Sequence, residues 1–294
     1  MKDLKLLGGC LAMTREAIRV EDLTYIYRDG TLALNGVSLS VDEGEFIGLI
    51  GQNGSGKTTL AKCIAGLLKP ARGRILIYGR DTKDMRVKEL ATSVGYVFQN
   101  PDHQIFNSTV FDELAFGPRN LLLPEDEVRQ RVLEAAKIVG LSEEHFNQSP
   151  FFLPKGLRQR IAIGSILALR PKILIIDEPT TGQDWRQSLE IMEFLKRLNE
   201  RGHTVIIITH EMEIVARYAR RTVVMSEGRI ILDGPTSEVF LESDILARAF
   251  VRPPQVARIL SSLNLSNNQL LTNDALTPEK FAEVILKYLK NKSI

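Results

Sequence analysis

The chain has 294 residues, enough to bury a substantial hydrophobic core in one α/β domain with appended pieces. Its 38 Lys and Arg residues are balanced by 36 Asp and Glu residues, and the formal net charge of +2 does not indicate nucleic acid or an anionic membrane as a partner. Two cysteines, Cys10 and Cys63, do not amount to a disulfide framework, and no apolar run has the length of a membrane span, so we expect a reducing compartment and contact with a membrane only through a protein partner.

Segments with strand character come first in the chain. Residues 1–15 are expected to be a loose lead, and residues 18–20, 24–27 and 39–41 have the apolar and aromatic composition of strands. Turn signals at Asp29-Gly30 and after the last of these segments separate them. The sequence therefore predicts a β-rich layer ahead of the motifs that follow.

A phosphate-binding pattern comes next. Residues 51–58 match G-x-x-x-x-G-K-[ST] at every fixed position, and glycine suits a loop whose backbone N–H groups wrap around phosphate oxygens. Lys57 would neutralise phosphate charge and the Thr58 hydroxyl would meet Mg²⁺ at the start of a helix. A buried strand predicted over 46–50 and a helix predicted from the loop to Pro70 argue against a chance match. The predicted nucleotide-binding residues of this loop are Gly51, Gln52, Asn53, Gly54, Ser55, Gly56, Lys57, Thr58 and Thr59.

The middle of the chain changes from strands to helices. Strands are predicted over 74–78 and 94–98, and from about residue 102 to 169 the apolar residues recur at helical spacing. In one of these helices Pro124 lies near the start and Gly140 at the end. The pattern predicts an α-helical insertion, whose last helix we expect from Leu157 to Leu169.

Two carboxylates follow the next predicted strand. The apolar run of residues 173–176 leads directly into Asp177 and Glu178, at the carboxyl end of a buried strand, where open α/β sheets bind their ligands. Asp177 is placed to hold Mg²⁺, and Glu178 to orient or deprotonate an attacking water. A plain surface turn is the alternative, which the phosphate loop upstream disfavours. Another predicted strand, 205–209, ends in His210, which either contacts the γ-phosphate or is structural.

In this order, the motifs resemble the nucleotide-binding subunit of an ATP-binding cassette (ABC) transporter over about residues 17–240. The resemblance implies an aromatic side chain that stacks on adenine. Tyr27 matches it best, with Tyr25 close by as a core aromatic or as the alternative. It further implies that two such subunits sandwich two ATP molecules, each between one subunit's phosphate loop and the other's signature segment.

The resemblance also assigns roles to single residues. Gln99 matches the glutamine of the Q-loop, Asp184 closes the D-loop of residues 181–184, and His210 matches the switch histidine. Catalysis would then involve Glu178, His210 and Gln99, with ATP as substrate. The implied Mg²⁺ ligands are Thr58, Gln99 and Asp177.

The implied fold is α/β, a P-loop NTPase cassette with a RecA-like core, an N-terminal antiparallel β layer and an α-helical subdomain. The nucleotide-binding domain would cover residues 16–240, with its helical subdomain at about 102–169. Residues 241–294 would form a small helical extension through which two subunits pair.

A narrower resemblance lies in residues 98–106 and 115–118, which are similar to the ATPases of energy-coupling factor (ECF) transporters for vitamin and transition-metal uptake. There the segment after the Q-loop helps form the groove for the coupling helices of the membrane subunit. Pro253-Pro254 and the helix opened by Thr277-Pro278 are similar to the family's C-terminal pairing region. The face of that helix, which could equally fold back on its own domain, comprises Phe281, Val284, Ile285, Tyr288 and Leu289.

The signature segment departs from the family's Leu-Ser-Gly-Gly-Gln. Its residues are Leu153, Pro154, Lys155, Gly156 and Leu157. Pro154 has neither a hydroxyl nor a backbone N–H to offer the partner's γ-phosphate, although proline is also welcome in the first turn of a helix. We therefore expect an asymmetric ATPase heterodimer with a non-identical paralogue.

The leading hypothesis is an ATP-hydrolysing subunit of an ECF-type importer, docked at the cytoplasmic face of the membrane. Its partners would be the second ATPase, a transmembrane coupling subunit and a substrate-binding membrane subunit, with no nucleic acid. The closest alternative is the ATPase of another ABC importer subfamily. A non-transport ABC ATPase is disfavoured because the chain has neither a long coiled coil nor two cassettes. A regulatory subunit without hydrolysis is disfavoured because Glu178, His210 and Gln99 are all present.

Overall fold

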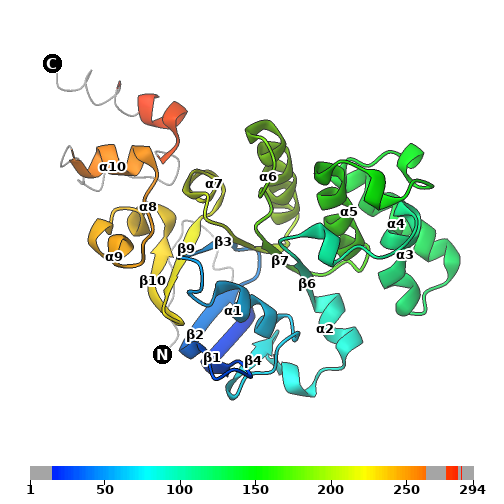
Figure 1. Cartoon of the computed structure of the whole chain (residues 1–294), viewed down its shortest axis with the longest axis horizontal. Coiled ribbons are helices and arrows are strands. Elements are labelled where there is room, and N and C mark those ends of the chain that lie inside the picture. The colour runs from blue at the N-terminus through cyan, green and yellow to red at the C-terminus, as the bar shows by residue number, and fades with distance from the viewer. Residues whose placement is uncertain (1–14, 263–275, 284–285, 287–294) are drawn as a thin grey trace.

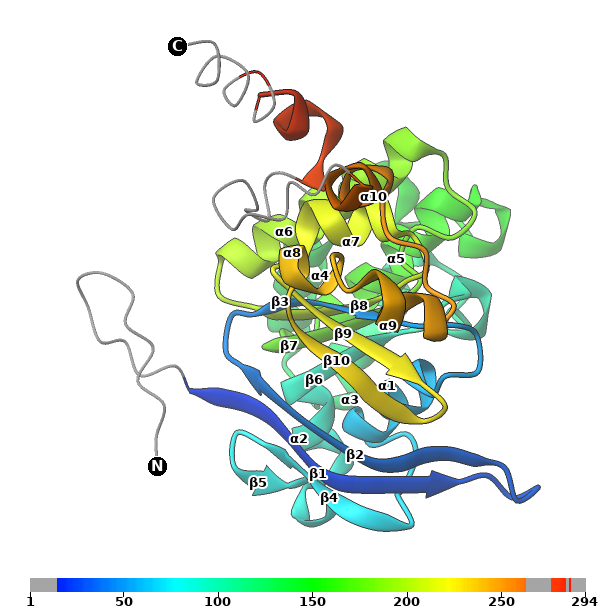
Figure 2. The same cartoon turned by 90° about the vertical axis from the view of Figure 1, so that its left-hand side faces the viewer.

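The computed structural model describes residues 15–262, 276–283 and 286, and it contains two sheets with helices around them (Figures 1 and 2). Cys10 and nearly all of the predicted lead lie outside the described residues. The same is true of four residues on the face predicted for the C-terminal helix, namely Val284, Ile285, Tyr288 and Leu289.

The first sheet is antiparallel and has the order β2-β1-β4-β5. Its strands are β1 (Glu16–Ile26), β2 (Leu32–Asp42), β4 (Arg72–Ile77) and β5 (Arg80–Asp81). The predicted β layer is thereby confirmed, but the two strands expected at 18–20 and 24–27 form one continuous strand. The strand continues through the polar residues between these two segments. Its pairing with β2 is irregular there, and Asp22 has a φ of 45°. Because β1 ends at Ile26, Tyr27 lies just beyond the strand.

The second sheet has the order β10-β9-β3-β8-β7-β6 and is parallel from β9 to β6. Its strands are β3 (Phe46–Ile50), β6 (Val94–Val97), β7 (Ile173–Asp177), β8 (Thr204–Ile208), β9 (Arg221–Ser226) and β10 (Arg229–Pro235). Every residue of β3, β6, β7 and β8 is buried, as expected for parallel strands covered on both faces. The parallel pairing brings the carboxyl ends of β3, β7 and β8 to one edge of the sheet.

The helices outside the insertion are α1 (Lys57–Ile64), α2 (Val87–Ser93), α6 (Trp185–Glu200), α7 (Met212–Tyr218), α8 (Thr236–Val239), α9 (Ser243–Arg248) and α10 (Gln255–Ser262). The helix after the phosphate loop ends at Ile64, earlier than predicted. Gly66 takes a φ of 73° two residues later, which ends the helix in the left-handed region open to glycine. Cys63, in the last turn of α1, is buried, and this burial raises the pKa of its thiol to about 12.

The predicted insertion is confirmed as three helices that pack on one another, α3 (Val110–Asn120), α4 (Glu125–Val139) and α5 (Lys155–Leu167) (Figure 1, green). Pro124 precedes α4, and Gly140 ends it with a φ of 71°. The expected start of α5 at Leu157 was two residues late. Pro154 is the N-cap, and its carbonyl accepts hydrogen bonds from the N–H groups of Leu157 and Arg158.

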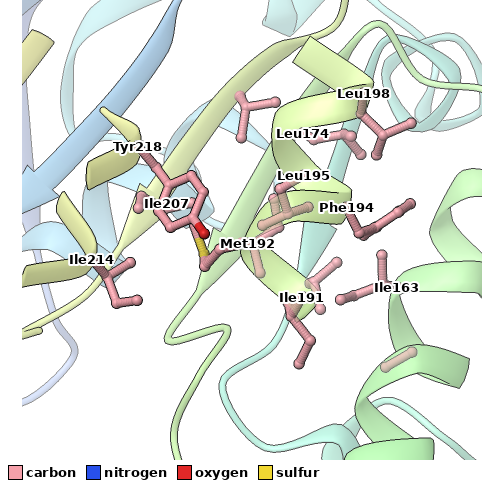
Figure 3. Close-up of a cluster of buried hydrophobic side chains, with 14 of the residues drawn as sticks. Ile163, Leu174, Ile191, Met192, Phe194, Leu195, Leu198, Ile207, Ile214 and Tyr218 are labelled. Atoms are coloured by element: carbon pink, nitrogen blue, oxygen red, sulfur yellow. The ribbon is translucent and has the colours of Figure 1, made fainter. Parts of the chain in front are cut away.

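A shared core joins the insertion to the second sheet. Helix α6 packs Met192 and Leu195 toward the strands that carry Leu174 and Ile207, and Phe194 toward Ile163 of α5 (Figure 3). Because these side chains belong to one buried cluster, the position of the insertion is set by the same core that supports β7 and β8.

The described part of the C-terminal extension lies against its own domain. Leu276 is buried in the core cluster that contains α6 and α7, and Nη2 of Arg217 in α7 lies 3.2 Å from Oε1 of Glu279. In the part of the chain that the structure describes, no helix is long and apolar enough to span a membrane.

Candidate nucleotide site

The loop between β3 and α1 is built for close approach of its backbone to a ligand. Gly51, Gly54 and Gly56 have φ values of 144°, 81° and 101°, which residues with a Cβ rarely adopt. A Cβ on Gly56 would lie 2.6 Å from the carbonyl oxygen of Ala33. Gly51 and Gly56 are therefore required by both conformation and space, and Gly54 by its conformation alone.

Lys57 is the buried cation of this loop. Its Nζ donates to the carbonyl oxygens of Gly51 and Gln52, each at 2.8 Å. Burial lowers the pKa of the ammonium group, while the carboxylates of Glu178 and Asp177 act in the opposite direction. The two carbonyl groups carry no net charge, so a phosphate group bound beside Lys57 would supply negative charge to the buried ammonium.

Asp177, at the end of β7, meets two hydroxyl groups. Its Oδ2 accepts from Thr58 Oγ1 at 2.8 Å and from Tyr96 Oη at 3.0 Å. Burial, and next the charge of Asp177, raise the pKa of the Tyr96 hydroxyl well above its usual range, so Tyr96 stays a donor. Asp177 of β7 is therefore held by hydroxyl groups from two other elements, α1 and β6.

Oxygen donors near the loop suit Mg²⁺. The carboxylate of Asp177, the hydroxyl of Thr58 and the amide of Gln99 all line one cleft, and Mg²⁺ prefers such ligands together with phosphates and water. Among the described residues no cluster of three or more His, Cys, Asp or Glu is placed to hold a metal ion by itself. The donor set therefore fits a metal that is bound mainly through a nucleotide.

Glu178 lies between two side chains that fix its carboxylate. Its Oε1 is 2.9 Å from Nδ1 of His210, and its Oε2 accepts from Thr181 Oγ1 at 3.3 Å. Because a carboxylate accepts, Nδ1 carries the hydrogen in the first contact. Glu178 also has a φ of 51°, an uncommon conformation for a residue with a Cβ, and its N–H donates to the carbonyl of Ile208. The Glu178 side chain is 9% exposed and the His210 side chain 66%.

Tyr27 lies at the mouth of the same cleft. Its hydroxyl is 2.9 Å from Thr59 Oγ1, and its ring meets the ring of Tyr25 edge to face. Tyr25 packs against the core of the first sheet, whereas Tyr27 lines the cleft. The structure thus favours Tyr27 over Tyr25 as the residue that can reach a ligand.

The cleft has a volume of about 300 Å³, and ten of the fourteen residues predicted for nucleotide binding, metal binding and catalysis line it. Those that line it are Tyr27, Asn53, Gly54, Gly56, Lys57, Thr58, Thr59, Gln99, Asp177 and Glu178.

The signature segment is not part of this cleft. Leu153 is buried, Pro154 and Lys155 are exposed, and Gly156 faces the D-loop, where a Cβ would lie 3.1 Å from Oε1 of Gln183. Asp184 accepts from the N–H of Gln187 at 2.8 Å and caps the start of α6. Within one chain the structure brings the signature to the D-loop and not to the phosphate loop.

Sequence reasoning missed Tyr96 and Thr181 as supports of the two carboxylates. Tyr96 was predicted only as part of a strand. A tyrosine inside a buried strand needs a hydrogen-bond partner for its hydroxyl, so its presence in the predicted strand could have indicated a polar partner nearby. Thr181 gave no signal of its own, because its contact with Glu178 depends on the turn after β7.

Comparisons with known proteins place this site in context. The family model described as ABC transporter matches residues 34–181. A protein named as an ABC transporter ATP-binding protein from Caldanaerobacter subterraneus subsp. tengcongensis is 52% identical over 246 residues, which are 84% of this chain and 43% of that relative, so the chain spans less than half of it. An energy-coupling factor transporter ATP-binding protein of the same organism is 43% identical over 280 residues, 93% of this chain and 98% of the relative.

A solved structure agrees with these relatives. The structure of cbiO1 from Clostridium perfringens, described as part of the ABC transporter complex cbiONQ, superimposes with a TM-score of 0.71 at 39% sequence identity. The match covers 84% of this chain and 99% of that one.

Proposed function

The chain belongs to the family of ABC transporter ATP-binding proteins, and from this premise we propose that it is the ATPase subunit that powers an ECF-type importer. Proteins of this family are ATPases that bind ATP. The subfamily rests on the 43% identity to an energy-coupling factor ATPase that the chain matches over 98% of its length. The cargo would be a vitamin or a transition-metal ion.

The observation that carries the proposed chemistry is the convergence of Lys57, Asp177, Glu178 and His210 at the carboxyl edge of one sheet. In the proposed mechanism the loop N–H groups and Lys57 hold the phosphates of ATP. Glu178, oriented by His210 and Thr181, accepts a proton from the attacking water.

Thr58, Asp177 and Gln99 would hold Mg²⁺, which when bound neutralises charge that develops on the phosphate oxygens. The Thr58 hydroxyl donates to Asp177, so the oxygen atoms of these two residues already lie next to each other. Tyr96 donates to the same oxygen of Asp177 and limits its rotation.

The proposed partner in hydrolysis is a second, non-identical ABC ATPase. The signature segment lies away from the chain's own cleft and has exposed residues at Pro154 and Lys155, so it is available to a nucleotide on another subunit. The chain would be a peripheral subunit at the cytoplasmic face of the membrane, in a complex that also includes a transmembrane coupling subunit and a substrate-binding membrane subunit.

An exposed aromatic pair supports contact with the coupling subunit. Phe106, after the Q-loop, is 60% exposed, Phe116 of α3 is 43% exposed, and their rings meet edge to face with centroids 4.6 Å apart. Two exposed aromatic rings side by side are typical of surfaces that bind another protein.

The test is to isolate the tagged chain from native membranes and identify the proteins bound to it. We expect a second ABC ATPase, a coupling protein and a small membrane protein. Phe106→Glu should lose both membrane proteins but keep ATP binding, whereas the control Val87→Glu, at an 86% exposed residue of α2, should keep them. Isolation with a periplasmic binding-protein system would instead favour another importer subfamily, and binding to DNA or ribosomes without membrane proteins would contradict a transport role.

A further inference from the structure

A cavity of about 490 Å³, larger than the nucleotide cleft, lies between α4 of the insertion and α6 of the core. Its apolar lining comes from Ile138 of α4 and from Phe194 and Leu198 of α6. Phe194 and Leu198 project from the side of α6 that faces the insertion (Figure 3). A volume of this size is in the range of small-molecule sites.

The rim of this cavity is basic. Lys137 lies in the last turn of α4, Arg197 in the last turn of α6, and Arg201 at the C-cap of α6. Within the described ranges, none of these three side chains makes an ion pair, whereas the rim carboxylate, Glu134, is paired with Arg170. Three exposed cations at one cavity therefore have no ion-pair partner among the described residues.

Helix ends account for only part of this charge. Basic residues near the C-terminus of a helix offset its carbonyl groups, which together amount to roughly half a negative elementary charge per helix. Two helix ends thus balance about one of the three positive charges. The remainder favours an anionic ligand.

We propose that this cavity, here called the α4–α6 site, binds a small amphipathic anion whose acidic head meets Lys137, Arg197 and Arg201. Its apolar body lies on Phe194, Leu198 and Ile138. An inorganic anion would leave the apolar lining empty, and a neutral apolar molecule would leave the cations unpaired. Only a molecule with both features matches the whole lining.

Binding there would join two parts of the fold. Lys137 belongs to the insertion, which also includes the signature segment, and Arg197 and Arg201 belong to the helix that packs on β7 and β8. One ligand that contacts both walls would add a further connection between the insertion and α6 to the one that the shared core already makes.

The experiment titrates the full chain with the fluorescent probe 8-anilinonaphthalene-1-sulfonate, a sulfonate with an aromatic body, with excess ADP present to fill the nucleotide cleft. We expect saturable binding that Arg197→Ala combined with Arg201→Ala weakens by about 10-fold or more, because charge-assisted contacts are lost. Lys196→Ala, at an exposed residue beside Arg197 that does not line the cavity, should leave the affinity unchanged. Lys137→Glu tests the opposite wall and should weaken binding as well.

Competition with the bound probe then tests the acidic head and the apolar body of the ligand separately. Octanoate should displace the probe, whereas acetate and octanol at the same concentration should not. Unchanged probe affinity in the Arg197→Ala, Arg201→Ala and Lys137→Glu variants, or displacement by octanol or acetate as strong as by octanoate, would overturn the proposal. The measurement involves no ATP turnover, so its result is independent of the transport function.

Discussion

Nδ1 of His210 lies 2.9 Å from Oε1 of Glu178, and the two residues follow neighbouring parallel strands, β8 and β7. Each strand ends at the same edge of the sheet, so residues 32 positions apart in the chain meet by topology. The histidine is mostly exposed and the glutamate nearly buried, which leaves the imidazole as the movable partner of a fixed carboxylate.

Glu178→Gln tests this carboxylate as the general base. The amide has nearly the same size and can still meet His210 or Thr181, so ATP binding should be retained. Hydrolysis in the assembled complex should slow by roughly 10²–10⁴-fold. Single-turnover measurement of phosphate release checks this, and a parental rate would show that another group accepts the proton.

Thr181→Val tests whether the D-loop hydroxyl positions Glu178. The change keeps the shape of the side chain and removes one hydrogen bond, typically about 0.5–1.5 kcal/mol, so turnover should fall by about 2- to 12-fold. Thr181→Ser is the matched control and should restore turnover. If Thr181→Val instead raises the KM for ATP with unchanged kcat, the hydroxyl acts on nucleotide binding and not on the base.

Lys57→Ala should abolish ATPase activity in the assembled complex. The ammonium group lies against the carbonyls of the phosphate loop, where charge-assisted hydrogen bonds to phosphate are worth about 1.5–3 kcal/mol each. Stabilisation of the isolated chain by ATP, about 2.7 kcal/mol at a concentration 100 times Kd, should also disappear from its thermal unfolding. The exposed Lys69→Ala variant should keep both. Near-normal turnover of Lys57→Ala would exclude this loop as the catalytic phosphate site.

Gly56→Ala and Gly54→Ala form a matched pair for the loop backbone. Both residues have positive φ, so alanine costs about 1–2 kcal/mol of conformational strain at each. At Gly56 the new methyl group would also lie 2.6 Å from the carbonyl oxygen of Ala33, whereas at Gly54 nothing lies within 4 Å. Gly56→Ala should therefore lower the free energy of unfolding by about 1–3 kcal/mol more than Gly54→Ala does. Equal losses in denaturant unfolding without nucleotide would contradict the steric part of this reasoning.

The sequence predicted those parts of the molecule whose cause is local. The phosphate loop follows from its glycines, β7 from its continuous apolar run, and the ends of α4 from Pro124 and Gly140. These features depend on few neighbours in space. The α/β cassette fold, in contrast, was implied by the resemblance to ABC transporter subunits, and the similarity to solved ABC cassettes confirms it.

Features that depend on distant contacts were not predicted. The continuity of β1 across Asp22 depends on its pairing with β2 and β4. The early end of α1 was missed although its cause, the positive φ of Gly66, is local, because apolar residues continue at helical spacing beyond it. The support of Asp177 by Tyr96 joins residues 81 positions apart. Apolar periodicity carries no information on such contacts.

Pro154 bears on the proposed asymmetry of the ATPase pair. Pro154 caps α5 with neither a side-chain hydrogen bond nor a backbone N–H, and its segment lies against the D-loop, outside the chain's own cleft. In a heterodimer, this chain's phosphate loop would be completed by a partner signature that retains serine. The site that uses Pro154 would lack one contact to phosphate.

A lost contact of about 1.5–3 kcal/mol slows that site by about one to two orders of magnitude if it is made mainly in the transition state. The chain alone should therefore hydrolyse ATP slowly and the complex rapidly. In the complex, Glu178→Gln should remove most of the turnover, and a change of the partner's equivalent base should remove little.

Pro154→Ser should raise the turnover of the chain alone. Pro154→Ala, which regains the N–H without a hydroxyl, should raise it less. Full activity of the chain alone, or equal losses from the two base substitutions, would show that Pro154 is harmless, because each site would then work equally well with either signature.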